Sequence, residues 1–131
     1  MCVMAAGLAL VFGVARGLEP DPKGFGTHTQ LGLAPCHFAW ATGQRCPTCG
    51  MTTSFAWFVR GRFDQSWRAN PAGALLAPAC AALAVWLVVG AVVGRPVGFR
   101  SLETPLIGLV VAAVALSVLS WTVRLLLGRV S

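Results

Sequence analysis

The sequence predicts an all-α integral membrane protein with three transmembrane helices and short interfacial helices in the first loop. Its 131 residues suffice for one domain, so we expect a single membrane domain over residues 1–131. Hydrophobic residues make up 56% of the chain and charged residues only 11%, whereas a soluble domain carries about 25% charged residues. A chain of this composition cannot cover a water-facing surface, and three apolar stretches provide the expected spans.

The first expected span covers residues 1–18. This stretch is almost wholly apolar as far as Ala15, and Arg16 follows. It is short for a span, which needs about 20 residues. However, it lacks the basic amino-terminal region of a signal peptide. We therefore predict a transmembrane helix here rather than a cleaved leader.

The first loop is expected over residues 19–70. Its first eight residues contain two prolines and two glycines, which prevent regular structure. Two short helices are predicted further on, at about residues 52–60 and 65–69. Hydroxyl groups of residues 52–54 are expected to cap the first helix, and Asp64 the second. Their aromatic and basic side chains suit a membrane interface.

The second span is predicted over residues 71–94 and the third over residues 105–127. Asn70 and Pro71 form a start signal, because Asn is a favoured N-cap and Pro at the first helical position needs no amide hydrogen bond. Arg124 lies one turn from the end of the last apolar run. Its side chain is long enough to reach the membrane interface from there.

Thiol chemistry is concentrated in the run Cys46-Pro47-Thr48-Cys49-Gly50. Pro47 favours a turn that points both thiols at one spot. Gly50 supplies a backbone conformation that residues with a Cβ resist. A helix that starts after this motif places the thiols near its amino terminus, where the helix dipole favours thiolate.

A third thiol, Cys36, lies ten residues before Cys46, and two histidines are nearby in the sequence. Three cysteines and one histidine complete a tetrahedral zinc site. The candidate metal ligands are Cys36, Cys46 and Cys49, with His28 or His37 as the fourth. Two other interpretations stay open: Cys46 and Cys49 could exchange with a disulfide, or the cysteines could serve only in packing. Zinc is the expected cofactor under the first interpretation alone.

Residues 36–52 resemble the signature of a bacterial family of small membrane proteins, domain of unknown function 2752. That family pairs an upstream Cys with Thr-Gly and then Cys-Pro-x-Cys-Gly-x-Thr. It continues with a helix, a Gly and an Asn-Pro before a membrane helix, which here are Gly61, Asn70 and Pro71. Many members carry Arg after the motif Thr, where this chain has Thr53. The resemblance implies the architecture and the candidate site, but no activity, because the family's function is not established.

The basic residues predict an orientation. In the three-span arrangement, eight of them fall on one side of the membrane, and Arg95 and Arg100 fall on the other. The positive-inside rule then places the Cys loop and the C-terminus in the cytoplasm and the N-terminus outside. The expected location is the bacterial inner membrane. A cytoplasmic loop keeps its thiols reduced, which favours metal binding or packing over a stable disulfide.

The absent motifs narrow the function. The four acidic residues form no paired site and there is no Walker loop, which argues against hydrolase and ATPase chemistry. Basic residues flank apolar runs rather than forming a patch, which indicates lipid headgroups and not nucleic acid as partners. We predict a membrane module whose Cys loop is structural or metal-binding, acting through membrane-protein partners or as a homo-oligomer. The alternative is a membrane thiol-disulfide oxidoreductase that uses Cys46 and Cys49, so enzymatic activity stays open.

Overall fold

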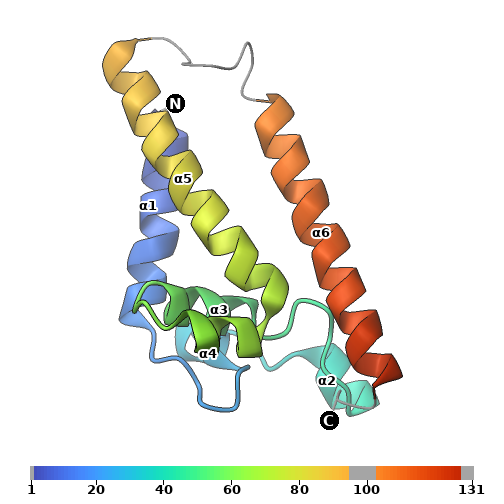
Figure 1. The fold of residues 1–131 in the computed structure, drawn as a ribbon. Coiled ribbons are helices and arrows are strands. Elements are labelled where there is room, and N and C mark those ends of the chain that lie inside the picture. Colours follow the sequence, from blue (N-terminus) through green and yellow to red (C-terminus); the bar gives the residue numbers. More distant parts are fainter. Residues whose placement is uncertain (1, 95–102, 128–131) are drawn as a thin grey trace.

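The computed structural model describes residues 2–94 and 103–127, and these residues form six α-helices and one 3₁₀ helix, with no strand among them (Figure 1). The predicted all-α class is therefore confirmed. In chain order the elements are α1 (Cys2–Gly17), η1 (Thr27–Leu31), α2 (His37–Thr42), α3 (Met51–Phe58), α4 (Phe63–Ala69), α5 (Pro71–Val93) and α6 (Glu103–Leu126).

Two of the described helices, α5 and α6, are long and apolar enough to cross a membrane. Each helix contains an 18-residue apolar stretch, of which 17% is buried in the protein for α5 and 6% for α6. A core helix of a soluble protein is mostly buried. Large aliphatic side chains such as Val85, Val92 and Val110 therefore stand exposed along both helices. The bounds of the two helices lie within two residues of those predicted for the second and third spans.

Two candidate spans, rather than the predicted three, are present among the described residues, because the helix within the first predicted span, residues 1–18, is too short. The described helix α1 has 16 residues, so its length is about 24 Å at 1.5 Å per residue. This is less than the hydrocarbon core of a bilayer, which is about 30 Å thick. The described helix α1 is apolar enough to lie in a bilayer, but it is too short to cross one. The helix instead packs along α5 and against α3 (Figure 1).

Arg60 binds the end of α1. Its guanidinium donates hydrogen bonds to the carbonyl oxygens of Ala15, Arg16 and Leu18 at 3.3, 2.9 and 2.8 Å. It also donates to the carbonyl of Ala56 in α3 at 2.8 Å. The last carbonyls of a helix lack partners within the helix, and a cation there complements the helix dipole. Arg60 thereby joins the end of α1 to α3.

Helices α3 and α4 lie across the lower ends of α1 and α5 in Figure 1, where small residues allow close packing. The buried Oγ atoms of Ser54 in α3 and Ser66 in α4 are 2.8 Å apart. A Cβ atom on Gly73 of α5 would lie 2.8 Å from the Cβ of Ser54. The two short helices predicted in the first loop are therefore present, and small side chains set their distance from α5.

The predicted caps of these short helices are wrong. The N-cap of α3 is Gly50, and that of α4 is Arg62, and neither makes a side-chain capping bond. Asp64 lies within the first turn of α4 instead of before it. Thr53 and Ser54 are buried, and their hydroxyl groups bond to neighbouring segments rather than to the start of their own helix. Burial between helices overrides the local capping preference at these positions.

Helix α6 is attached to the first loop through Trp121. The indole Nε1 donates a hydrogen bond to the carbonyl oxygen of Arg45 at 2.8 Å. The ring also meets Phe38 of α2 edge to face, with a centroid distance of 6.3 Å. These contacts place the residue before Cys46 against the last third of α6.

Candidate metal centre

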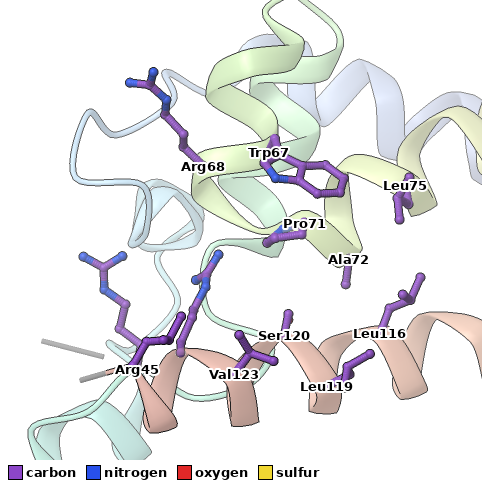
Figure 2. Close-up of a pocket in the computed structure, with 12 residues that line it drawn as sticks. Arg45, Trp67, Arg68, Pro71, Ala72, Leu75, Leu116, Leu119, Ser120 and Val123 are labelled. Carbon is purple, nitrogen blue, oxygen red and sulfur yellow. The ribbon is translucent and has the colours of Figure 1, made fainter. Parts of the chain in front are cut away.

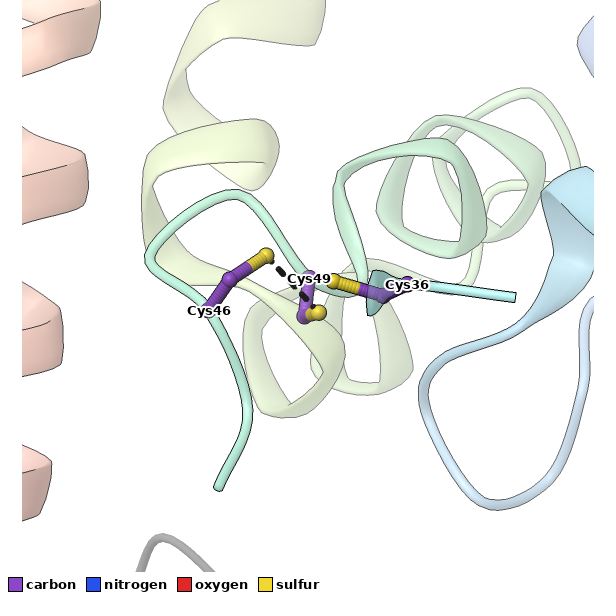
Figure 3. Close-up of side chains that lie close together, drawn as sticks. All are labelled: Cys36, Cys46 and Cys49. Atoms are coloured by element: carbon purple, nitrogen blue, oxygen red, sulfur yellow. Dashed lines mark hydrogen bonds between the residues drawn. The ribbon is translucent and has the colours of Figure 1, made fainter. Parts of the chain in front are cut away.

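The two motif thiols meet in a hydrogen-bonded turn. The backbone N–H of Cys49 donates to the carbonyl of Cys46 at 3.0 Å, and that of Met51 donates to the carbonyl of Thr48 at 3.1 Å. The Sγ atoms of Cys46 and Cys49 are 2.9 Å apart (Figure 3). The turn expected from Pro47 is therefore present, and it directs both sulfurs to one spot.

Gly50 completes this turn in the left-handed backbone region, with φ of 86°. A Cβ at this position would lie 2.6 Å from the carbonyl oxygens of both Ala69 and Gly24. The expectation that Gly50 supplies a conformation unsuited to other residues is confirmed. The close approach adds a second requirement for glycine, because the turn lies directly against the end of α4.

Asn70 connects the thiol turn to the start of α5, and its side chain is 2% exposed. Its Oδ1 accepts hydrogen bonds from the N–H groups of Ala72 and Gly73 at 2.9 and 3.3 Å. Its Nδ2 donates to the carbonyls of Pro47 and Cys49 at 3.3 and 3.2 Å. The predicted N-cap is therefore confirmed. The amide nitrogen has a further role, because it holds the turn that carries both thiols.

Cys36 is brought to the same place from the N-cap position of α2. The Sγ atoms of Cys36, Cys46 and Cys49 all lie within 4.8 Å of one another, and each residue is partly buried. Figure 3 shows the three side chains converging from two separate segments. Thiolates on one zinc ion lie about 3.5–4 Å apart, given Zn–S bonds near 2.3 Å. The predicted convergence of the three cysteines is confirmed. Small movements of their side chains would bring the sulfurs to the spacing that one zinc ion requires.

The two histidines differ in position. His28, in η1, lines the same cavity of about 340 Å³ as the three cysteines, whereas His37 is not among its lining residues. Neither histidine belongs to the group of ligand atoms that lie within 4.8 Å of one another. A fourth ligand from His28 or His37 therefore stays a prediction, and the shared cavity favours His28.

The sequence did not indicate two buried threonines beside this cavity. Thr27 and Thr53 are 0% and 1% exposed, and their Oγ1 atoms are 2.7 Å apart. Thr27 Oγ1 also accepts a hydrogen bond from the backbone N–H of Asp21 at 3.1 Å. The pair connects η1 to α3 and so places His28 beside the thiols. No sequence pattern indicates it, because the two residues are far apart along the chain.

The two motif thiols differ in acidity. Burial opposes ionisation of Cys46, but hydrogen bonds to its sulfur from Cys49 and Thr48 outweigh burial and lower the pKa of this thiol below its ordinary value. Burial and the hydrogen bond to Cys46 together raise the pKa of Cys49 to about 12. In the absence of metal, Cys46 is therefore the more acidic of the two thiols.

All five cysteines lie in the described residues, and none forms a disulfide. Cys80 lies in α5 and packs against the buried residues Ala15, Phe55 and Ala77. Cys2, at the start of α1, is exposed. Cys2 and Cys80 do not belong to the group formed by Cys36, Cys46 and Cys49, and they serve as internal controls for those three thiols.

We expect iodoacetamide to modify Cys46 at least about tenfold faster than Cys49 at pH 7.5 in metal-free protein, because the thiolate is the nucleophile. The rate at Cys46 should level off at a lower pH than that of an ordinary thiol. The rate at Cys49 should still be rising at pH 10, because its pKa is about 12. Mass spectrometry of timed samples gives both rates, with exposed Cys2 as the reference. Faster modification of Cys49 would contradict the assignment.

Residues 36–84 match the sequence model of a family described as Protein of unknown function (DUF2752). The match begins at Cys36 and takes in α2, α3, α4 and the first part of α5. The resemblance drawn from the Cys motif is therefore confirmed over this segment, which is a little over a third of the chain. No curated protein and no solved structure matches the chain.

Proposed function

We propose that this chain is a membrane-embedded module whose Cys36, Cys46 and Cys49 thiolates hold one zinc ion at the membrane surface. The observation that carries the proposal is the approach of the three sulfurs to within 4.8 Å of one another. Thiolates are soft ligands, and a cluster of three favours zinc over magnesium or calcium. The long, apolar and largely unburied helices α5 and α6 support insertion in a bilayer.

The proposed role of the metal is structural. Zinc sites with four protein ligands are closed and stabilise a fold, whereas catalytic sites keep one position open. His28 shares the cavity with the thiols and is the proposed fourth ligand. The ion would then join three segments of the first loop, namely η1, the start of α2 and the turn before α3. Asn70 hydrogen-bonds the same turn to α5, so metal binding would stabilise the loop at the start of α5. Other membrane proteins or a second copy are the proposed partners.

The proposed orientation keeps the Cys loop in the cytoplasm of a bacterial inner membrane. With α5 and α6 as the two spans, the first loop and the end of α6 lie on the same side (Figure 1). That end carries six arginines and one lysine of the described residues, and the positive-inside rule assigns such an end to the cytoplasm. They are Arg16, Lys23, Arg45, Arg60, Arg62, Arg68 and Arg124. The two basic residues expected on the other side, Arg95 and Arg100, lie outside the described residues.

Metal analysis of the detergent-purified full chain tests the metal site. We expect about one zinc per chain, and loss of zinc in each of Cys36→Ser, Cys46→Ser and Cys49→Ser. Cys80→Ser and Cys2→Ser are matched controls and should retain the metal. Cobalt substitution should add the intense sulfur-to-cobalt absorption of a thiolate site, and His28→Ala should alter it. Equal metal content in the Cys36→Ser and Cys80→Ser variants would refute the site.

A second candidate function, thiol-disulfide exchange, is favoured by the 2.9 Å separation and unequal acidity of Cys46 and Cys49. The Cys46 thiolate would attack a substrate disulfide, form a mixed disulfide and release one substrate thiolate. Cys49, on losing its proton, would attack the Cys46 sulfur and release the second thiol. The pair is then oxidised by two electrons and needs a dithiol reductant to return.

Cys36 separates the two functions, because the metal site needs it and the exchange pair does not. If the chain is a redox enzyme, Cys36→Ser should keep a reversible Cys46–Cys49 disulfide, which acid trapping and alkylation would detect in cells. If the chain holds zinc, the wild-type thiols should be trapped reduced, and Cys36→Ser should lose the ion.

A further inference from the structure

A second cavity, of about 610 Å³, lies between the start of α5 and the last turns of α6. Its walls also include Trp67 and Arg68 of α4 and Arg45 of the loop, and none of the five cysteines lines it (Figure 2). It is therefore separate from the candidate metal centre. Two of its walls are the helices proposed to cross the membrane.

One end of this cavity is strongly basic. Arg45, Arg68 and Arg124 line it, and no acidic side chain does. In the part of the chain that the structure describes, which includes all four acidic residues, none of these arginines pairs with a carboxylate side chain. Arg45 and Arg124 are close enough to repel each other electrostatically. Three like charges at one cavity end are stabilised when an anion lies between them.

The guanidinium of Arg45 remains able to bind an anion. Its Cζ lies over the ring of Phe25, 4.2 Å from the ring centroid. This cation–π contact is not a hydrogen bond, so the N–H groups of the guanidinium can still donate to a phosphate. The Trp121 indole holds the backbone of the same residue at its carbonyl. Arg45 is thus positioned at the cavity by contacts that do not occupy its donors.

The other end of the cavity is apolar. Figure 2 shows Arg45 and Arg68 toward one end, and Leu75 and Leu116 toward the other. Leu116 lies eight residues before Arg124 on α6, which is about 12 Å along the helix axis. In the proposed bilayer, the arginines therefore lie at headgroup level and the leucines lie in the hydrocarbon. This order of charge and apolar surface matches a phospholipid.

We propose that this second cavity binds one anionic phospholipid from the leaflet on the side of the Cys loop. Its phosphate is held by Arg45, Arg68 and Arg124, and one acyl chain lies along Leu75, Leu116 and Leu119. The proposal rests on the membrane placement of α5 and α6 in the proposed function, but it does not depend on the metal. A zwitterionic lipid would leave the arginines without a net counter-charge, so the anionic lipid is favoured.

Native mass spectrometry of the full chain in detergent, titrated with phosphatidylglycerol or phosphatidylcholine of the same acyl chains, tests the proposal. We expect one phosphatidylglycerol to be retained about tenfold more strongly than phosphatidylcholine. Each of Arg45→Gln, Arg68→Gln and Arg124→Gln should weaken phosphatidylglycerol binding about fivefold and leave phosphatidylcholine binding unchanged. Arg62→Gln is the matched control, because Arg62 stacks over Trp57 on the same side and does not line the second cavity.

Two further variants keep the test sharp. Leu116→Trp narrows the apolar half without changing charge, and it should reduce binding of the lipid. If phosphatidylglycerol bound this variant as strongly as the wild type, the cavity would hold only the phosphate and not the acyl chain. Inorganic phosphate should then compete with the lipid. Equal binding of the two lipids, or an Arg62→Gln effect as large as the others, would overturn the proposal. Cys36→Ser, whatever its metal content, should keep the lipid preference, so failure of the metal proposal is recognised separately.

Discussion

Replacing Gly50 by alanine is expected to lower the free energy of unfolding by about 3–5 kcal/mol, because two separate costs add. The backbone has φ of 86°, which an L side chain rarely adopts. The new Cβ would also lie 2.6 Å from the backbone oxygens of Ala69 and Gly24, and neither is a flexible side-chain end. The turn must shift, so metal content and the rate of Cys46 alkylation should change together with stability. Thermal unfolding in detergent measures the first effect.

Gly61→Ala is the matched control for this variant. Gly61 has φ of 73°, and a Cβ there would meet no heavy atom within 4 Å. The control isolates the backbone cost, which is about 1–2 kcal/mol, and it should leave the metal content unchanged. Equal destabilisation by the two substitutions would show that the close approach of Gly50 to α4 contributes nothing.

Asn70→Ala is expected to lower the free energy of unfolding by about 2–4 kcal/mol. Loss of the cap costs about 1 kcal/mol. Loss of the Nδ2 donor leaves the carbonyls of Pro47 and Cys49 short of a partner, at about 1–3 kcal/mol for a buried group. The thiol turn loses its attachment to α5, so the affinity for metal should fall as well. Unfolding in detergent and competition with a zinc chelator measure the two effects.

Two substitutions separate the halves of the Asn70 side chain. Asn70→Asp keeps the capping oxygen but replaces the amide donor by an oxygen that faces two carbonyls, so it should lose stability although the cap is retained. Pro71→Ala should cost less than about 1 kcal/mol, because the first helical position has no amide bond to lose. If Asn70→Asp were as stable as the wild type, the contacts to Pro47 and Cys49 would contribute nothing.

The sequence by itself determined the features that depend on local backbone conformation or on composition. It predicted the all-α class and the bounds of α5 and α6, because apolar stretches of span length leave few alternatives. It predicted the start of α5 at Asn70 and Pro71, and the turn at Gly50, because capping and positive φ are local properties. It also predicted that Cys36 returns to the motif, since the intervening loop is short.

Only the tertiary structure decided which partners the buried polar groups use. Thr53 and Ser54 have the chemistry of caps, but packing between helices turns their hydroxyl groups to Thr27 and Ser66. Asn70 caps α5 as its sequence context predicts, yet its amide nitrogen binds carbonyls more than 20 residues away. A buried polar group bonds to whatever the fold places within reach, and that choice is not encoded locally.

The tertiary structure also showed which helices are long enough to span a membrane, and it formed the second cavity. Helix α1 is as apolar as a span, but Arg60 binds its last carbonyls, and the described helix is too short to cross. Arg45, Arg68 and Arg124 are scattered in the sequence, where each marks only the end of an apolar run. They line one cavity because α4, α6 and the loop meet beside the start of α5. Long-range packing brings these charges together, and no local pattern along the chain specifies that packing.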